Sequence, residues 1–132
     1  MTTEQILLYT VVLLVAALYI RRVMRLRAIK NYSPGELQER LQRAPHPILL
    51  DVRTAAERQT GAIKGSIHIP VRELRRREHE LEKHREREVI CYCQSGSRSV
   101  SAALALKKLG HNVGNLRGGI AEWNFAQLPS KR

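Results

Sequence analysis

The sequence is poor in cysteine: its 132 residues include only two, Cys91 and Cys93. Residues two positions apart in a strand face the same side, and a disulfide between such close neighbours has unfavourable geometry. So few cysteines at this spacing exclude the disulfide framework of a small secreted domain. We interpret one of the two as a buried structural residue and the other as a functional thiol.

Signals for metal ions and for nucleic acid are also lacking. The histidines occur at no metal-ligand spacing, so we expect neither a metal site nor a cofactor. They are His46, His68, His79, His84 and His111. Aromatic residues make up only 5% of the chain and no nucleic-acid-binding motif is present, so we do not expect nucleic acid as a partner. The net charge of +11 instead favours small anionic substrates and membrane lipid.

Charge is absent from residues 6–20, "ILLYTVVLLVAALYI". As a helix this run reaches about 22 Å at ~1.5 Å per residue, against about 30 Å for the hydrocarbon core of a bilayer. Snorkelling of Arg21 and Arg22 lets the following residues extend the apolar length. We therefore predict one transmembrane helix, with residues 1–27 as a membrane anchor and residues 28–132 as a single soluble domain.

Two other interpretations of this segment fit less well. A cleaved signal peptide carries positive charge before its apolar run and small residues after it, the reverse of the order here. An interfacial helix needs one polar face, and residues 6–20 have none. The run is followed by Arg21, Arg22, Arg25, Arg27 and Lys30. By the positive-inside rule, the soluble domain then lies in the cytoplasm, at a bacterial inner membrane, where thiols stay reduced.

The soluble part alternates between helix and strand signals. A helix begins at Ser33, which forms a capping box with Glu36 and is followed by Pro34 at the first helical position. The expected helices are residues 33–43, 72–88, 99–110 and, after a turn at Gly118 and Gly119, the rest of the segment 117–128. The helix 72–88 is highly charged and solvent-exposed. The expected strands are residues 48–52, 66–71, 89–92 and 112–116. This alternation predicts an α/β fold with a central parallel sheet and helices on both faces.

Cys93 lies where a predicted strand ends and a helix has not begun, in "VICYCQSGSRSVSAAL", residues 89–104. In a parallel α/β sheet, ligands bind beyond the carboxyl ends of the strands. Gly96 and the surrounding serines let the backbone turn its N–H groups inward, and the following helix adds the positive end of its dipole. With Arg98 nearby, we expect a lowered pKa of Cys93 and a thiolate at neutral pH. The structural alternative is a buried cysteine beside a serine-rich helix start.

Four segments of the sequence resemble the rhodanese family in order and spacing. They are "LLDVR" with Glu57, "GAIKGSIHIPV", "VICYCQSGSRS" and "LRGGIAEW", and the resemblance covers about residues 31–128. The resemblance implies a single rhodanese-like domain. It also implies that Cys93 carries a persulfide, taking sulfane sulfur from a small anionic donor such as thiosulfate and passing it to cyanide or a thiol.

The resemblance also implies roles for residues around Cys93. Backbone amides would cradle the terminal sulfur along the loop formed by Gln94, Ser95, Gly96, Ser97, Arg98 and Ser99. Arg98 would in addition steer anionic donors. A supporting polar group next to the loop would consist of Asp51, Arg53 and Glu57. Two positions depart from the family pattern, Ala62 in place of the usual His and Lys64 in place of Pro, which bears on donor preference rather than on the fold.

Two alternative functions stay open at this point. Cell-cycle phosphatases and arsenate reductases resemble the same scaffold, but their loop has the form Cys-x5-Arg, whereas Cys93 and Arg98 form Cys-x4-Arg. A shorter loop makes a smaller anion nest, which suits one sulfur atom better than a tetrahedral phosphate. The other alternative is a non-catalytic module that docks partners at the membrane, and an intact Cys93 argues against it.

Overall fold

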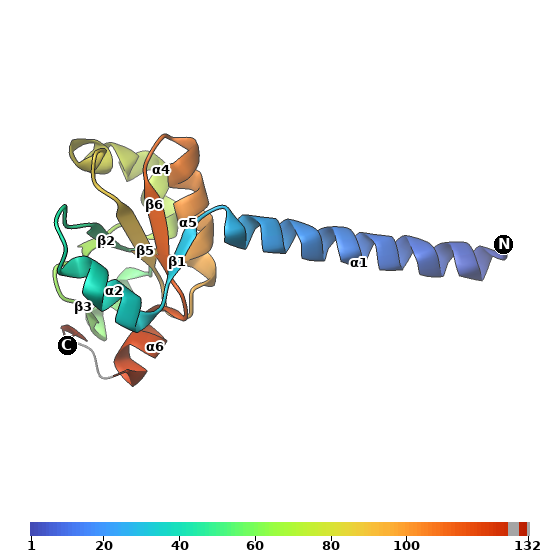
Figure 1. Ribbon diagram of the computed structural model, residues 1–132, viewed down its shortest axis with the longest axis horizontal. Coiled ribbons are helices and arrows are strands. Elements are labelled where there is room, and N and C mark those ends of the chain that lie inside the picture. The colour runs from blue at the N-terminus through green and yellow to red at the C-terminus, as the bar shows by residue number, and fades with distance from the viewer. Residues whose placement is uncertain (127–129, 132) are drawn as a thin grey trace.

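The computed structural model describes residues 1–126 and 130–131. A long helix, α1 (Thr3–Arg27), projects from an α/β domain that contains the rest of these residues (Figure 1). Thr2 caps α1 through a capping box with Gln5. At ~1.5 Å per residue the helix is about 37 Å long. Its most apolar window has a mean hydropathy of 2.0 and is not buried by the domain, so α1 is long and apolar enough to cross a membrane.

The centre of the domain is a five-stranded sheet whose paired strands are all parallel. The spatial order is β1 (Lys30–Tyr32), β6 (Val113–Leu116), β5 (Val89–Tyr92), β2 (Ile48–Asp51) and β4 (Ile67–His68). A separate antiparallel pair joins β3 (Ala62–Ile63) to β7 (Ser130–Lys131). The predicted central parallel sheet is confirmed.

Helices cover both faces of the sheet, as the sequence predicts (Figure 1). On one face, α5 (Ser97–Lys108) and α4 (Leu74–Arg77) cover an apolar cluster; on the other, α2 (Pro34–Leu41) and α6 (Gly119–Phe125) cover a second cluster. Side chains of β5 alternate between the two, because successive residues of a strand face opposite sides. Cys91 therefore packs under α5, while Ile90 and Tyr92 pack under α2 and α6.

The charged segment 72–88 is not the single helix that its composition predicts. It is divided into the 3-10 turn η1 (Val71–Glu73), the single turn of α4 and the 3-10 segment η2 (Glu78–His84). Its ion pairs between residues three apart include Arg76–Glu73, Arg77–Glu80 and Arg85–Glu82. A 3-10 helix aligns side chains at this spacing, so these pairs fit the tighter geometry. Leu74 and Leu81 anchor the segment in the core.

Other boundaries differ from the predictions by a few residues, and three short strands and one short helix were missed. The expected strand 66–71 is reduced to β4, and α5 begins at Ser97, before the expected start at residue 99. Residues 127–128 of the last predicted helix lie outside the described residues. The sequence analysis missed β1, the pair of β3 and β7, and α3 (Ala55–Gln59), which begins with a capping box of Thr54 and Glu57.

Candidate active site

Cys93 lies at the carboxyl edge of the sheet, one residue beyond the central strand β5. The segment 94–96 connects it to α5, and Gly96 precedes that helix with a left-handed φ of 105°. Because α5 begins here, its first N–H groups have no partner within the helix and point toward the loop. The sequence thus places a thiol at the ligand-binding edge of a parallel sheet and at the positive end of a helix.

The Cys93 thiol is buried, with 0% of the residue exposed. Its Sγ atom accepts a hydrogen bond from the backbone N–H of Gly96 at 3.0 Å and lies 3.4 Å from the hydroxyl oxygen of Ser99. Burial alone raises the pKa of Cys93, but hydrogen bonds from the side chain and backbone of Ser99 and from the N–H groups of Gly96 and Ser95 outweigh it. The net pKa is lowered, in the direction that the sequence analysis expects.

Cys91 has the opposite electrostatic environment. It is also fully buried, on the same face of β5, and both cysteines are free thiols. Burial, with a smaller contribution from the charge of Cys93, raises the pKa of Cys91 to about 12. The structure therefore separates an inert core cysteine from a cysteine whose thiolate is stabilised.

The start of α6 holds the loop from the other side. The N–H of Ile120 donates to the carbonyl of Cys93 at 2.9 Å, and the N–H of Ala121 donates to the carbonyl of Gln94 at 3.1 Å. Gly119 makes this approach possible: a Cβ there would lie 2.4 Å from the Cys93 oxygen and 2.5 Å from the Gln94 oxygen. The sequence analysis treated the two glycines of "RGG" only as a turn, and it missed their contact with the loop.

Hydrogen-bonded polar side chains connect the neighbourhood of the thiol, through β6 and β1, to the end of α1. The hydroxyl of Ser99 donates to Asn115 Oδ1 at 2.6 Å, and Asn115 Nδ2 donates to Asn31 Oδ1 at 3.0 Å. Asn31 Nδ2 donates to the carbonyl of Leu26, in the last turn of α1, at 2.8 Å. The geometry therefore connects the end of α1 to the residue next to the sulfur. Neither asparagine was expected from the sequence as part of the site.

The predicted supporting pair of Asp51 and Arg53 lies buried beside the loop. Arg53 binds the carboxylate of Asp51 through Nε at 3.0 Å and Nη2 at 2.9 Å, and its Nη1 donates to Gln94 Oε1 at 3.4 Å. Burial would raise the pKa of Asp51, but the hydrogen bonds and charge of Arg53 lower it overall. Arg58 and Tyr92, which the sequence analysis missed, bind the same carboxylate at 3.2 and 3.1 Å. This cluster holds the first residue after Cys93.

The predicted residues Glu57 and Arg98 bind each other. Two parallel hydrogen bonds of 2.7 Å join the guanidinium of Arg98 to the carboxylate of Glu57, across 41 positions of sequence. These hydrogen bonds lower the pKa of Glu57 to about 2, so the pair is ionised at every ordinary pH. The positive charge of Arg98 is therefore largely neutralised by a partner, whereas the sequence analysis expected it to face anionic donors.

A group of possible metal ligands lies away from this site, near the amino end of β6. Glu78, Glu82 and His111 bring ligand atoms within 4.8 Å of one another. However, the guanidinium of Arg85 binds both carboxylates, and His111 Nε2 lies 2.7 Å from Glu78. Arg85 thus supplies the positive charge that a metal would bring. The expectation of no metal site stays a prediction.

A family model for the rhodanese-like domain matches residues 33–126 of this chain. The chain belongs to the rhodanese-like family. The match includes both the loop at Cys93 and the glycines at the start of α6, which the structure brings into contact. The predicted fold, a single rhodanese-like α/β domain preceded by an apolar helix, is confirmed.

Three known proteins are similar to this chain over most of their own length. A protein named sulfurtransferase from Allochromatium vinosum is 38% identical over 102 residues, covering 76% of this chain and 94% of that protein. A putative mitochondrial thiosulfate sulfurtransferase from Schizosaccharomyces pombe is 36% identical over 114 residues, covering 73% and 80%. The crystal structure of a rhodanese-related protein from Thermoplasma volcanium has a TM-score of 0.70 at 33% identity, covering 76% and 96%. These similarities support a sulfurtransferase role for this rhodanese domain.

Proposed function

We propose that this rhodanese domain transfers sulfane sulfur as a persulfide on Cys93. The environment of Cys93 Sγ supports this most directly. The sulfur is buried, but its pKa is lowered because N–H groups of the loop and Ser99 donate hydrogen bonds to it. The same donors suit a persulfide, whose terminal sulfur also carries negative charge. Cys91, with its pKa raised to about 12, offers no such environment.

The proposed reaction has two displacement steps. The Cys93 thiolate attacks the outer sulfur of thiosulfate, forming a new S–S bond, while the electron pair of the broken S–S bond leaves with sulfite. Cyanide or a thiolate then attacks the terminal sulfur of the persulfide, and the electron pair of the Cys93 S–S bond returns to the cysteine sulfur. The donors around Sγ stabilise the negative sulfur before and after each step.

The arrangement of Arg98 argues against the phosphatase alternative. A phosphate needs donors around three oxygens, and the arginine that ends a Cys-x5-Arg loop is one of their sources. Here the corresponding guanidinium binds Glu57 through two 2.7 Å hydrogen bonds. The four-residue spacing between Cys93 and Arg98 also leaves a smaller ring of backbone donors. We therefore propose transfer of sulfur and not hydrolysis of phosphate.

Intact mass spectrometry after incubation with thiosulfate tests this proposal. The wild-type protein is expected to gain the mass of one sulfur atom and to lose it when cyanide is added. The Cys93→Ser variant should gain nothing, and the Cys91→Ala variant, as the matched control on the same strand face, should behave like wild type. Loading of the Cys93→Ser variant, or turnover of aryl phosphate by the wild-type protein, would contradict the assignment.

We further propose that α1 spans a bacterial inner membrane with the rhodanese domain on the cytoplasmic side. The support is the apolar length of α1 followed by its cluster of arginines, of which Arg25 and Arg27 lie in the last turn. Protease added outside spheroplasts should leave the domain intact, and alkaline carbonate should not extract the protein from membranes. Digestion of the domain in sealed spheroplasts would reverse the proposed orientation.

A further inference from the structure

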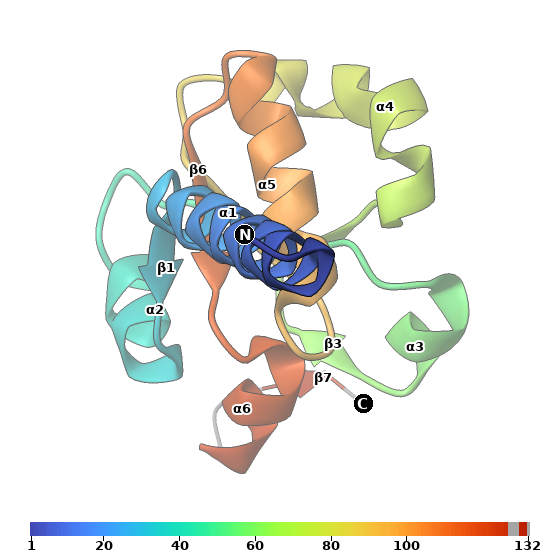
Figure 2. The same cartoon turned by 90° about the vertical axis from the view of Figure 1, so that its right-hand side faces the viewer.

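An open groove of about 1010 Å³ lies between the last turns of α1 and the loop that follows Cys93. Viewed along α1 from its amino-terminal end, the helix passes in front of α5, and the loop before α5 lies directly below it (Figure 2). The loop contributes Ser95, Gly96 and Ser97 to the groove. The helix contributes Arg21, Arg22 and Arg25, and the segment after β6 contributes Arg117.

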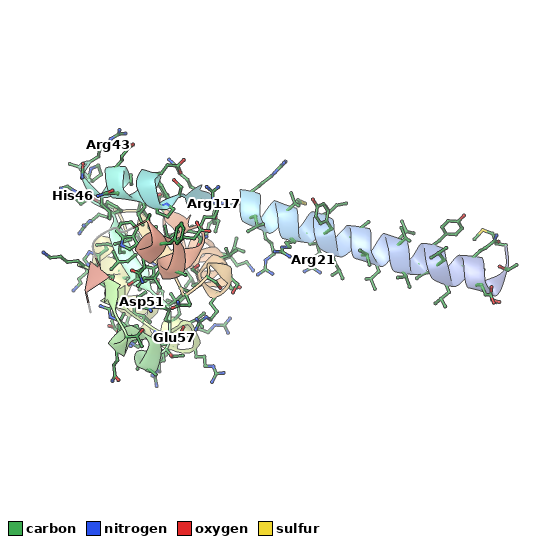
Figure 3. All side chains as sticks on the ribbon, turned by 90° about the horizontal axis from the view of Figure 1, so that it is seen from below. Arg21, Arg43, His46, Asp51, Glu57 and Arg117 are labelled. Carbon is green, nitrogen blue, oxygen red and sulfur yellow. The ribbon has the colours of Figure 1, made fainter. Side chains whose placement is uncertain are left out.

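The four arginines of this groove differ from the arginines under the loop in having no carboxylate partner. Arg53 and Arg98 are bound to Asp51 and Glu57, but no ion pair within residues 1–126 involves any of the groove arginines. Figure 3 shows Arg117 on the domain close to the end of α1, and Arg21 on the helix itself. Unpaired cations that converge on one cleft attract anions more strongly than the same charges spread over a surface.

The groove is held in place by polar contacts between α1 and the domain. Asn31 binds the carbonyl of Leu26 at 2.8 Å and accepts from Asn115 at 3.0 Å, and Lys107 of α5 binds the carbonyl of Ala28. The last turn of α1 is therefore fixed against the sheet and α5. The helix that ends in this turn places Arg21, Arg22 and Arg25 in the groove beside the loop that follows Cys93.

The wall of the groove is in direct contact with the sulfur. Gly96 contributes to the groove, and its N–H group donates to Cys93 Sγ at 3.0 Å. Ser95 and Ser97, which flank Gly96, also line the groove, and Cys93 itself is 0% exposed. An anion bound in the groove would thus lie against the residue whose N–H group binds the sulfur.

We propose that this groove binds the anionic sulfur donor and delivers it to Cys93, so that α1 forms part of the substrate site. The proposal rests on the sulfurtransferase function and assigns donor recognition to Arg117 and the arginines of α1 rather than to Arg98. The donor class is a small sulfur species with more than one negative charge, such as thiosulfate or a short polysulfide. Arginine suits this role because its planar guanidinium binds oxyanions through two parallel hydrogen bonds.

Steady-state kinetics of the full chain in nanodiscs of phosphatidylcholine alone test the groove. Thiosulfate is varied and cyanide is the acceptor. Arg117→Gln, and separately the triple variant Arg21→Gln, Arg22→Gln and Arg25→Gln, are expected to raise the KM for thiosulfate about tenfold, because each removes charge-assisted hydrogen bonds. The kcat should stay unchanged, and Arg117→Lys should recover part of the lost affinity.

Two matched controls remove the same charge elsewhere. Arg27 lies on the same helix but does not line the groove, and Arg43 lies on the far side of the domain from α1 (Figure 3). Arg27→Gln and Arg43→Gln should leave the KM for thiosulfate at the wild-type value. A thermal melt of every variant establishes that a changed KM does not come from unfolding.

The outcomes separate this proposal from its alternatives. Wild-type KM values in both groove variants, with sulfur loading of Cys93 intact, would overturn the groove while leaving the sulfurtransferase function standing. If those variants instead retained less phosphatidylglycerol than the wild-type protein in nanodiscs that contain this lipid, the groove would be a site for lipid headgroups. Failure of the wild-type protein to gain sulfur from thiosulfate or polysulfide would overturn the function itself, whatever the variants do.

Discussion

The middle of strand β5 and the loop beyond its end contain one cysteine each, and the two thiols differ in pKa although they are equally buried. Cys91 and Cys93 are both 0% exposed and both face the cluster under α5. Cys91 is paired on both sides, with Leu50 of β2 and Asn115 of β6, so the backbone around it is committed to the sheet. At Cys93 the strand has ended, and the N–H groups that follow turn toward the sulfur.

This comparison shows that burial alone does not set the character of a thiol. Burial raises the pKa of both cysteines, and at Cys91 little opposes it, so that the pKa reaches about 12. At Cys93 the donated hydrogen bonds reverse the direction of the shift. The end of a parallel strand is therefore the place where a buried cysteine can become a nucleophile, because backbone donors are free there. The following changes should weaken or strengthen that difference.

The largest effect is expected from Gly119→Ala, which should make Cys93 more like Cys91. Gly119 has a φ of 62°, and a Cβ there would overlap the carbonyl oxygens of Cys93 and Gln94. We expect a loss of about 2–4 kcal/mol in the free energy of unfolding, from left-handed strain and overpacking together. In the folded protein the pKa of Cys93 should rise as the loop is displaced. The pH dependence of iodoacetamide labelling measures the pKa, and urea unfolding measures the stability.

Gly65→Ala is the matched control for that substitution. Gly65 has a φ of 81°, but nothing lies within 4 Å of a Cβ placed there. The variant should therefore show the left-handed strain, about 1–2 kcal/mol, without any change in the labelling of Cys93. If both variants changed the pKa of Cys93 equally, the contact between α6 and the loop would not be what shapes the thiol.

Glu57→Gln should have a smaller effect of opposite sign: it should increase the difference in pKa between Cys91 and Cys93. The substitution keeps an oxygen for the Thr54 cap but removes the charge that neutralises Arg98. The freed guanidinium should lower the pKa of Cys93 further, as labelling at lower pH would show. Glu86→Gln removes an exposed carboxylate that has no ion pair within residues 1–126, and it should leave the thiol unchanged.

The stability difference between the wild-type protein and Glu57→Gln should depend on pH. The pKa of Glu57 falls from 4.5 to about 2 on folding, so its ionised form stabilises the fold. That stabilisation is fully present above about pH 4.5, and it is lost as the pH falls toward 2. At neutral pH the free energy of unfolding of the wild-type protein should be about 0.5–1 kcal/mol larger than that of Glu57→Gln. In acid the two free energies should become equal. A constant difference down to pH 2 would contradict the assigned pKa.

Four strands of the central sheet, the helices α2, α5 and α6, and the position of Cys93 at a strand end could be predicted from the sequence because local patterns determine them. Apolar runs mark β2 and β5, and the capping box at Ser33 marks the start of α2. The strand β1 was missed because three residues after a basic segment give no periodic signal. The division of residues 71–84 into 3-10 and α turns was missed because composition alone does not distinguish such turns from one continuous helix.

The contacts around Cys93 were less predictable because they join distant parts of the chain. The pairing of Arg98 with Glu57 was not expected, because Glu57 lies 41 positions away, on α3, an element that was itself missed. Gly119 was treated as a turn residue, although its lack of a side chain matters because the loop at Cys93 packs against it. Asn115 gives no sequence signal at all. Such roles follow from tertiary packing and not from local spacing.

The smallest effect on the pKa of Cys93 is expected from Ser99→Ala, and its sign shows whether the hydroxyl proton of Ser99 is donated to the sulfur or to an oxygen. The hydroxyl of Ser99 lies 2.6 Å from Asn115 Oδ1 and 3.4 Å from Cys93 Sγ, but it has a single proton to donate. If that proton reaches the thiolate, its removal should raise the pKa of Cys93, less than Gly119→Ala does because the N–H groups of Gly96 and Ser95 remain. We expect this rise in the iodoacetamide profile.

Ser101 provides the control for Ser99→Ala. Ser101→Ala, at an exposed position of α5, should change nothing at the thiol. If the proton is donated to Asn115 instead, Ser99→Ala should also cost about 1–3 kcal/mol of stability, because it leaves the buried oxygen of Asn115 without its donor. A fall in the pKa of Cys93 would mean that Ser99 keeps its proton on Asn115 and accepts a hydrogen bond from the thiol. In that case the backbone N–H groups alone would stabilise the thiolate, and the end of the strand would account for the whole difference between the two cysteines.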